Sequence, residues 1–144
     1  MNDDLKHLKG SDRRDTFKQM HKLRLGTGHW GSDLDFMIVD KYPPGIVAFF
    51  DYKEPGKSIT FAEMLAYNAL LMLAPLFIIE GPDPERGPFV ISQYKGGNWQ
   101  PNPPIPELEF VERCPTWNEL GKFEDRLKQE RRKQTKGAAR SSAF

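Results

Sequence analysis

The chain has 144 residues, of which 38% are hydrophobic, 28% charged and 12% aromatic. This composition supplies apolar material for one core, so we expect a single compact domain and exclude a largely disordered chain. One cysteine, Cys114, excludes an internal disulfide framework and a cysteine-rich zinc site. The longest apolar run, at 69–79, is shorter than the roughly twenty residues of a membrane span, and the N-terminus lacks an apolar signal segment. We therefore expect an intracellular, cytoplasmic protein with no membrane partner.

The net charge of +1 is unevenly distributed along the chain. Residues 1–32 carry seven Lys or Arg against four Asp or Glu, and residues 122–144 carry eight against three. Residues 33–112 carry only five basic residues against twelve acidic ones. Basic ends favour a polyanionic partner, although a solvated charged face produces the same pattern. The acidic middle indicates surface solubility, a metal site, or both.

The first predicted elements are a helix and a hairpin. Residues 11–25 have helical spacing of apolar side chains, with Ser11 as the cap, and the glycines of 26–32 indicate a loop. Residues 35–39 and 46–50 are short apolar strands. The paired prolines of 41–45 require a turn between the two strands.

The rest of the chain predicts a crossover helix, two strands and a final helix. Residues 60–73 are apolar on nearly every side, as in a helix packed against a sheet. Strands at 76–80 and 89–94 flank a turn, whereas four prolines and two glycines make 95–107 irregular. The final helix, at 116–134, carries an apolar stripe of Trp117, Leu120, Phe123 and Leu127.

This order of elements predicts an α/β fold with a mixed central sheet flanked by helices. The expected core occupies residues 1–112. An amphipathic basic helix is expected at 113–136, followed by a small, polar and disordered tail at 137–144.

Carboxylates flank the predicted hairpin. Asp33 and Asp35 share one face at the start of its first strand, and Asp51 and Lys53 share one face at the end of its second. Because antiparallel pairing brings the start of one strand beside the end of the other, these groups converge at one sheet edge. In the simpler interpretation they only cap strands and turns.

An ionised carboxylate directly after five apolar residues needs a cation or a salt bridge, and this is the position of Asp51. Carboxylates, a backbone carbonyl and water are the ligands that Mg²⁺ or Mn²⁺ prefers. A metal held there lowers the pKa of bound water and stabilises charge on phosphate. The Lys53 ammonium would orient the attacking water or neutralise the phosphate.

Asp35 and Asp51-Tyr52-Lys53, sixteen residues apart, resemble the signature of the PD-(D/E)XK, or restriction-endonuclease-like, nuclease superfamily. The resemblance implies a core of helix, three-stranded meander, helix and strand. Residues 11–94 fit this order with one strand unplaced, in 1–10 or 24–32. It also implies that Asp35, Asp51 and the Tyr52 carbonyl bind Mg²⁺ or Mn²⁺, and that Lys53 is catalytic.

Family members add further site residues at two places. For an acid from the first helix the chain offers Asp12 or Asp15, and for a polar group from the helix after the lysine it offers Glu63 and Tyr67. The sequence departs from the family pattern in two respects: Leu34 replaces the proline before the first acid, and the second acid is Asp rather than Glu. Asp33 is an alternative ligand to Asp35.

The sequence thus predicts a metal-dependent nuclease that hydrolyses phosphodiester bonds of DNA, with basic ends that grip the backbone. The core leaves little space for a recognition domain, so we expect weakly specific or structure-selective cutting, for which a homodimer is one arrangement. The alternative is a catalytically inactive module of the same fold that binds nucleic acid or protein. A third interpretation is an assembly protein that pairs through the apolar stripe of its final helix. His29 and Trp30 could contact a substrate, or pack locally in the glycine-rich loop.

Overall fold

The computed structural model describes residues 10–24, 34–98 and 105–142. The chain divides into two units, 1–32 and 33–144, which we describe separately. The first unit contains helix α2 (Gly10–Arg24), which confirms the helix predicted at 11–25. All other described elements belong to the second unit. No helix in the described ranges is both long and apolar enough to cross a membrane.

The second unit is built on a five-stranded mixed sheet. Its strands lie side by side in chain order: β1 (Phe36–Lys41), β2 (Pro44–Lys53), β3 (Leu76–Glu80), β4 (Phe89–Asn98) and β5 (Ile105–Cys114). β2 and β3 are parallel, and every other neighbouring pair is antiparallel. These strands confirm the predicted α/β class and the mixed sheet.

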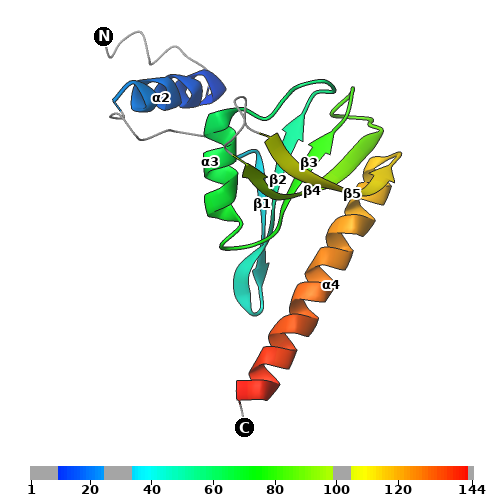
Figure 1. Ribbon diagram of the computed structural model, residues 1–144. Coiled ribbons are helices and arrows are strands. Elements are labelled where there is room, and N and C mark those ends of the chain that lie inside the picture. The colour runs from blue at the N-terminus through cyan, green and yellow to red at the C-terminus, as the bar shows by residue number, and fades with distance from the viewer. Residues whose placement is uncertain (1–9, 25–33, 99–104, 143–144) are drawn as a thin grey trace. The chain divides into compact units, whose positions relative to one another are not determined.

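Two helices cover opposite faces of this sheet (Figure 1). α3 (Phe61–Leu70) crosses over between the parallel strands β2 and β3, and its buried Tyr67 packs in a cluster with Phe49 and Tyr94. α4 (Trp117–Ser142) packs on the other face through Leu120 and Phe123. The core therefore has two halves, one on each side of the sheet.

A register shift in the hairpin determines which β2 side chains face which helix. Between Ile38 and Val39 of β1 the pairing skips one residue of β2, so that Val47 and Ala48 both join the α4-side cluster. After this bulge β2 alternates regularly. Asp51 and Lys53 consequently face α3, whereas Phe50 and Tyr52 face α4.

The prediction that 95–107 is irregular was wrong at both ends. β4 continues to Asn98 and β5 begins at Ile105. Gly96 lies at a shift in the β4–β5 register, so this glycine marks a bulge rather than the end of the strand. In β5, Glu107 and Glu109 alternate with Leu108 and Phe110, the two-residue period of a strand.

β5 follows the helix α3, so it is not the missing strand that the family resemblance implies before that helix. In the described residues only two strands, β1 and β2, precede α3, whereas we expected a third in 1–10 or 24–32. Gly10 and Arg24 are helical, and the remaining residues of those ranges lie outside the described part of the chain.

α4 is longer than the helix predicted at 116–134, and it extends to Ser142. Residues 137–142, which we expected in the tail, thus form its last turns. Gly137 is a weak helix former, but the alanines and the arginine that follow it favour a helix.

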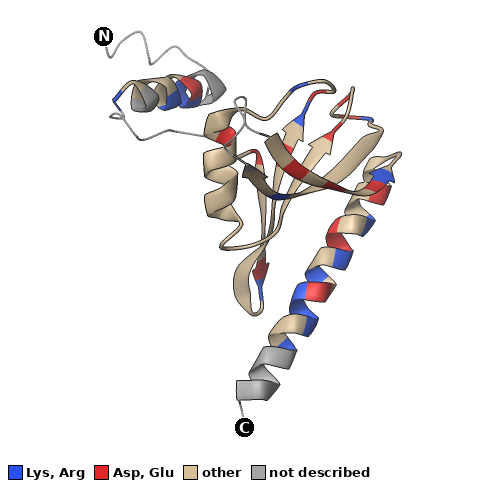
Figure 2. Ribbon diagram, in the orientation of Figure 1, with Lys and Arg blue, Asp and Glu red and all other residues tan. Residues whose placement is uncertain are grey.

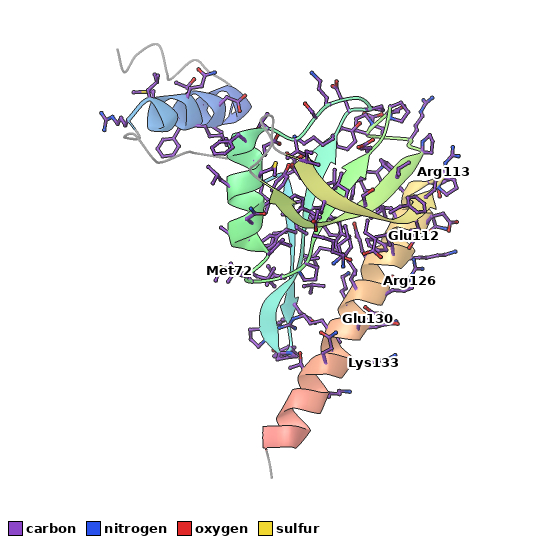
Figure 3. All side chains as sticks on the ribbon, viewed as in Figure 1. Met72, Glu112, Arg113, Arg126, Glu130 and Lys133 are labelled. Atoms are coloured by element: carbon purple, nitrogen blue, oxygen red, sulfur yellow. The ribbon has the colours of Figure 1, made fainter. Side chains whose placement is uncertain are left out.

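Charged side chains attach α4 to the sheet at two places. The Arg126 guanidinium pairs with Glu112 of β5, and both residues are labelled in Figure 3. Further along, Arg132 Nε lies 3.1 Å from Asp40 Oδ2, and Arg131 Nη1 donates to the Pro43 carbonyl at 2.9 Å. Figure 2 shows basic and acidic residues interspersed along α4. Part of its basic charge is therefore bound within the molecule.

We predict that Asp40→Asn destabilises the fold at neutral pH. The Arg132 guanidinium holds the pKa of the Asp40 carboxyl below its usual range. This stabilisation is present above the unfolded-state pKa of about 4 and is lost as the pH falls through the lower native pKa. Urea unfolding should show a deficit at pH 7 that narrows below pH 4.

The matched control is Asp125→Asn, which removes an exposed carboxylate 3.5 Å from Lys128 on the same helix. This exposed pair contributes little, so the control should unfold like the native protein. An Asp40→Asn deficit that stays constant from pH 7 to pH 2 would contradict the assigned ion pair.

Candidate functional site

The two aspartates of the sequence signature meet at the end of the β1–β2 hairpin. Phe36 pairs with Phe50 in the antiparallel register, so Asp35 and Asp51, one residue further on, lie opposite each other. Asp35 Oδ2 accepts a hydrogen bond of 2.8 Å from the Tyr52 backbone N–H. This bond fixes the Asp35 carboxylate beside the end of β2.

Asp51 is a buried carboxylate with only 4% of its surface exposed. Burial raises its pKa to about 7, and the neighbouring Asp35 adds to this effect against the opposing influence of Tyr67 and Lys53. Two carboxylates this close disfavour double ionisation. A cation between them would remove that repulsion.

Lys53 and Glu63 form an ion pair between the end of β2 and the first turn of α3. Their side chains are only 14% and 20% exposed, respectively. Glu63 also forms a capping box with Thr60, because its Oε1 accepts from the Thr60 N–H at 3.0 Å while the Thr60 hydroxyl accepts from the Glu63 N–H. Burial opposes ionisation of Glu63, but Lys53 and Thr60 lower its pKa overall.

The Tyr67 hydroxyl connects this pair to the aspartates. It donates to Asp51 Oδ2 and lies 3.2 Å from Glu63 Oε2. Burial and the Asp51 carboxylate raise the pKa of Tyr67, so it remains a neutral donor. Asp35, Asp51, Tyr67, Glu63 and Lys53 thus form one continuous network.

Tyr52 connects the network to the opposite face of the sheet. Its backbone N–H binds Asp35, while its side chain packs in the α4-side cluster and donates to the Gly81 carbonyl. This contact ties the end of β2 to the residue that follows β3. Tyr52 is therefore held by its main chain on one side and by its side chain on the other.

A cavity of about 250 Å³ opens beside Lys53 on the α3 face. Lys57, Ser58 and Glu80 also line it, and Glu80 is paired with Lys53 in the parallel β2–β3 register. The sequence analysis did not assign these three residues to the site. For Glu80 a signal existed, because an acid ends the apolar strand 76–80 just as Asp51 follows 46–50.

Several other predicted site residues cannot be related to this network. Asp33, His29 and Trp30 lie outside the described residues. Asp12 and Asp15 are both on α2, in the first unit, and the structure does not describe the side chain of Asp12. The structure therefore brings together Asp35, Asp51, Lys53, Glu63 and Tyr67, and leaves the alternative between Asp33 and Asp35 open.

The donors at the hairpin end are oxygens. Within the described ranges no three Asp, Glu, His or Cys side chains group as a metal site. The pair Asp35 and Asp51 offers two carboxylates, and the carbonyl of Tyr52 follows directly in the chain. Mg²⁺ is commonly bound by one or two carboxylates while it keeps several waters, so this donor set fits that ion.

The chain matches no protein-family model, no curated protein and no solved structure.

We predict that Tyr67→Phe destabilises the protein more than Tyr94→Phe, measured by urea unfolding in EDTA at a pH well above 7, where Asp51 is ionised. Both tyrosines are buried in one cluster and in contact, with ring centroids 5.2 Å apart. Tyr67 donates to the Asp51 carboxylate, whereas Tyr94 donates to the Asn68 amide oxygen at 2.6 Å. A hydrogen bond to a charged group contributes about 1.5–3 kcal/mol, against about 0.5–1.5 kcal/mol for a neutral one.

The difference between the two variants is the test, since both lose one hydroxyl and keep the ring. Equal losses would contradict the proposed link between Tyr67 and the ionisable network.

Proposed function

We propose that the chain is a metal-dependent nuclease with a restriction-endonuclease-like core, acting on phosphodiester bonds of DNA. The observation that carries the proposal is the position of Asp35 opposite Asp51, with Lys53 two residues further along β2 on the α3 face. This combination supplies acidic oxygens and an ammonium group at one strand end.

The metal ligands we propose are the carboxylates of Asp35 and Asp51 and the carbonyl of Tyr52. Mg²⁺ or Mn²⁺ bound to them would polarise the scissile phosphate and activate a water molecule. The chain contributes by fixing these oxygens: the Tyr52 N–H holds Asp35, and the Tyr67 hydroxyl holds Asp51. Such donors keep the carboxylates oriented before substrate binds.

Lys53 supplies positive charge to the reacting phosphate. Its ammonium would stabilise the negative charge that grows on the phosphate oxygens in the transition state. Glu63 positions Lys53 through their ion pair, and the capping box holds Glu63 at the start of α3. The cavity beside Lys53, which Lys57 also lines, offers space for the phosphate.

α4 offers further phosphate contacts. Lys122, Lys133 and Lys136 form no ion pair with any residue in the described ranges, and Lys133, labelled in Figure 3, is exposed. Such lysines bind the nucleic-acid backbone without sequence preference.

We expect wild-type protein to cut DNA with Mn²⁺ or Mg²⁺ and to be inactive in EDTA. Lys53→Met should lower the cleavage rate by about a hundredfold or more, since it removes a charge that acts in the transition state. It should still bind Mn²⁺ in calorimetry. Asp51→Asn should lose both cleavage and Mn²⁺ binding, because it removes a ligand charge.

Asp83→Asn and Lys95→Met, purified in parallel, control for contaminating nucleases and for general charge loss, since Lys95 is an exposed lysine that pairs with Glu109 and does not line the cavity beside Lys53. Plasmid, linear duplex, single-stranded and branched DNA define the substrate. Mn²⁺ binding that is unchanged by Asp51→Asn would overturn the proposed ligand set. DNA binding without metal dependence or cleavage would instead support the alternative, an inactive nucleic-acid-binding module.

A further inference from the structure

A second cavity lies on the α4 face of the sheet, beside Asp35. Its volume is about 510 Å³, within the range of small-molecule sites. It lies between the hairpin, the β3–β4 connection, β4 and α4, and its lining includes Asp35, Phe36, Pro84, Phe89, Trp117 and Glu124. The network of Asp51, Lys53, Glu63 and Tyr67 lies on the other face.

The aromatic walls of this cavity are held in place. Trp117 Nε1 donates to the Pro84 carbonyl at 3.1 Å, and its ring packs edge-on against Phe89 at 5.2 Å between centroids. Trp117 nevertheless remains 53% exposed, and Phe36, which contacts Phe50, is 57% exposed. Two large aromatic surfaces therefore remain open at the cavity.

The two carboxylates that line the cavity, Asp35 and Glu124, are hydrogen-bond acceptors, whereas the Tyr52 hydroxyl and the Trp117 Nε1 already donate to backbone carbonyls. Glu124 is half-buried and accepts no hydrogen bond from the residues that the structure describes, and burial raises the pKa of its carboxyl. Asp35 is the other carboxylate. An anion is disfavoured in such a cavity, whereas a flat apolar ring with N–H donors on its edge fits both the walls and the acceptors.

We propose that this cavity binds an unpaired nucleobase of the substrate, next to the proposed metal ligand Asp35. The inference rests on the proposed nuclease function. Asp35 provides the continuity, because the same carboxylate borders the cavity and faces Asp51. The base stacks on Trp117, and its amino group donates to Glu124. The preferred substrate is therefore single-stranded, or has an unpaired base at the cleavage point.

The test uses a single-stranded oligonucleotide with one 2-aminopurine, whose fluorescence falls on stacking, in EDTA so that no cleavage occurs. Wild-type protein should quench it. Trp117→Ala should abolish quenching and weaken binding about tenfold, the size of one lost base–aromatic stack. An oligonucleotide with an abasic site in place of the 2-aminopurine should bind the wild-type protein about tenfold more weakly, the same loss as Trp117→Ala causes. The affinity of the Trp117→Ala variant should be the same for both oligonucleotides.

Two variants serve as controls. Trp117→Phe keeps a ring at the cavity and should restore most of the quenching, which separates stacking from loss of folding. Phe110→Ala removes a 64% exposed aromatic from β5, outside the cavity, and should behave as wild type. Thermal unfolding of each variant establishes that it is folded.

Each outcome decides between the two proposals. Quenching that depends on Trp117, without metal-dependent cleavage of any DNA, supports the base site and overturns the nuclease. Cleavage that Trp117→Ala leaves intact, without quenching, overturns the base site alone. An apolar dye serves as a competitor for the cavity. If the dye binds the wild-type protein but not Trp117→Ala, and the oligonucleotide does not displace it, the occupant is a protein side chain and the base site is overturned.

Discussion

The close approach of Asp35 and Asp51 is the constraint on which the arrangement of the site depends. Asp51 is 4% exposed, at the end of a strand that is otherwise apolar, and a second carboxylate lies opposite it. Such a pair is tolerated only with donors or a cation nearby. α3 supplies one donor, the Tyr67 hydroxyl, which binds Asp51, and its Glu63 accepts from the Lys53 ammonium and holds that cation near the pair. The buried carboxylate at the end of β2 therefore depends on the packing of α3 against the sheet.

This arrangement explains why the crossover helix is both apolar and precisely capped. Its apolar side chains bury the sheet face, and the buried Met64 and Tyr67 belong to the same surface. Yet Glu63 serves the capping box and the lysine at once. A carboxylate that satisfies the first turn of a helix has little freedom to move. The ammonium of Lys53 is consequently held close to Asp51 rather than extending into solvent.

The sequence was informative where local patterns carry the structure. The period of two residues in 46–53 is sufficient to place Asp51 and Lys53 on one face, and antiparallel pairing brings Asp35 opposite. β5 was missed because glycines and prolines dominate 95–107, and its pairing with β4 depends on contacts far along the chain. The cavity at Trp117 was not predictable for the same reason. Trp117 belongs to the apolar stripe of a helix, and only the tertiary fold turns it toward Asp35.

The sheet separates two kinds of chemistry, and Asp35 lies at their boundary. On the α3 face, polar and charged groups surround Asp51. On the α4 face, Phe36 and Trp117 form an apolar cavity that reaches the same strand end. Tyr52 belongs to both, since its N–H binds Asp35 while its ring faces α4. A ligand with a charged group and a flat apolar group, as in a nucleotide, would therefore contact both faces at once. This is why we propose a nucleic-acid strand as the ligand, rather than a molecule that carries only a charged group.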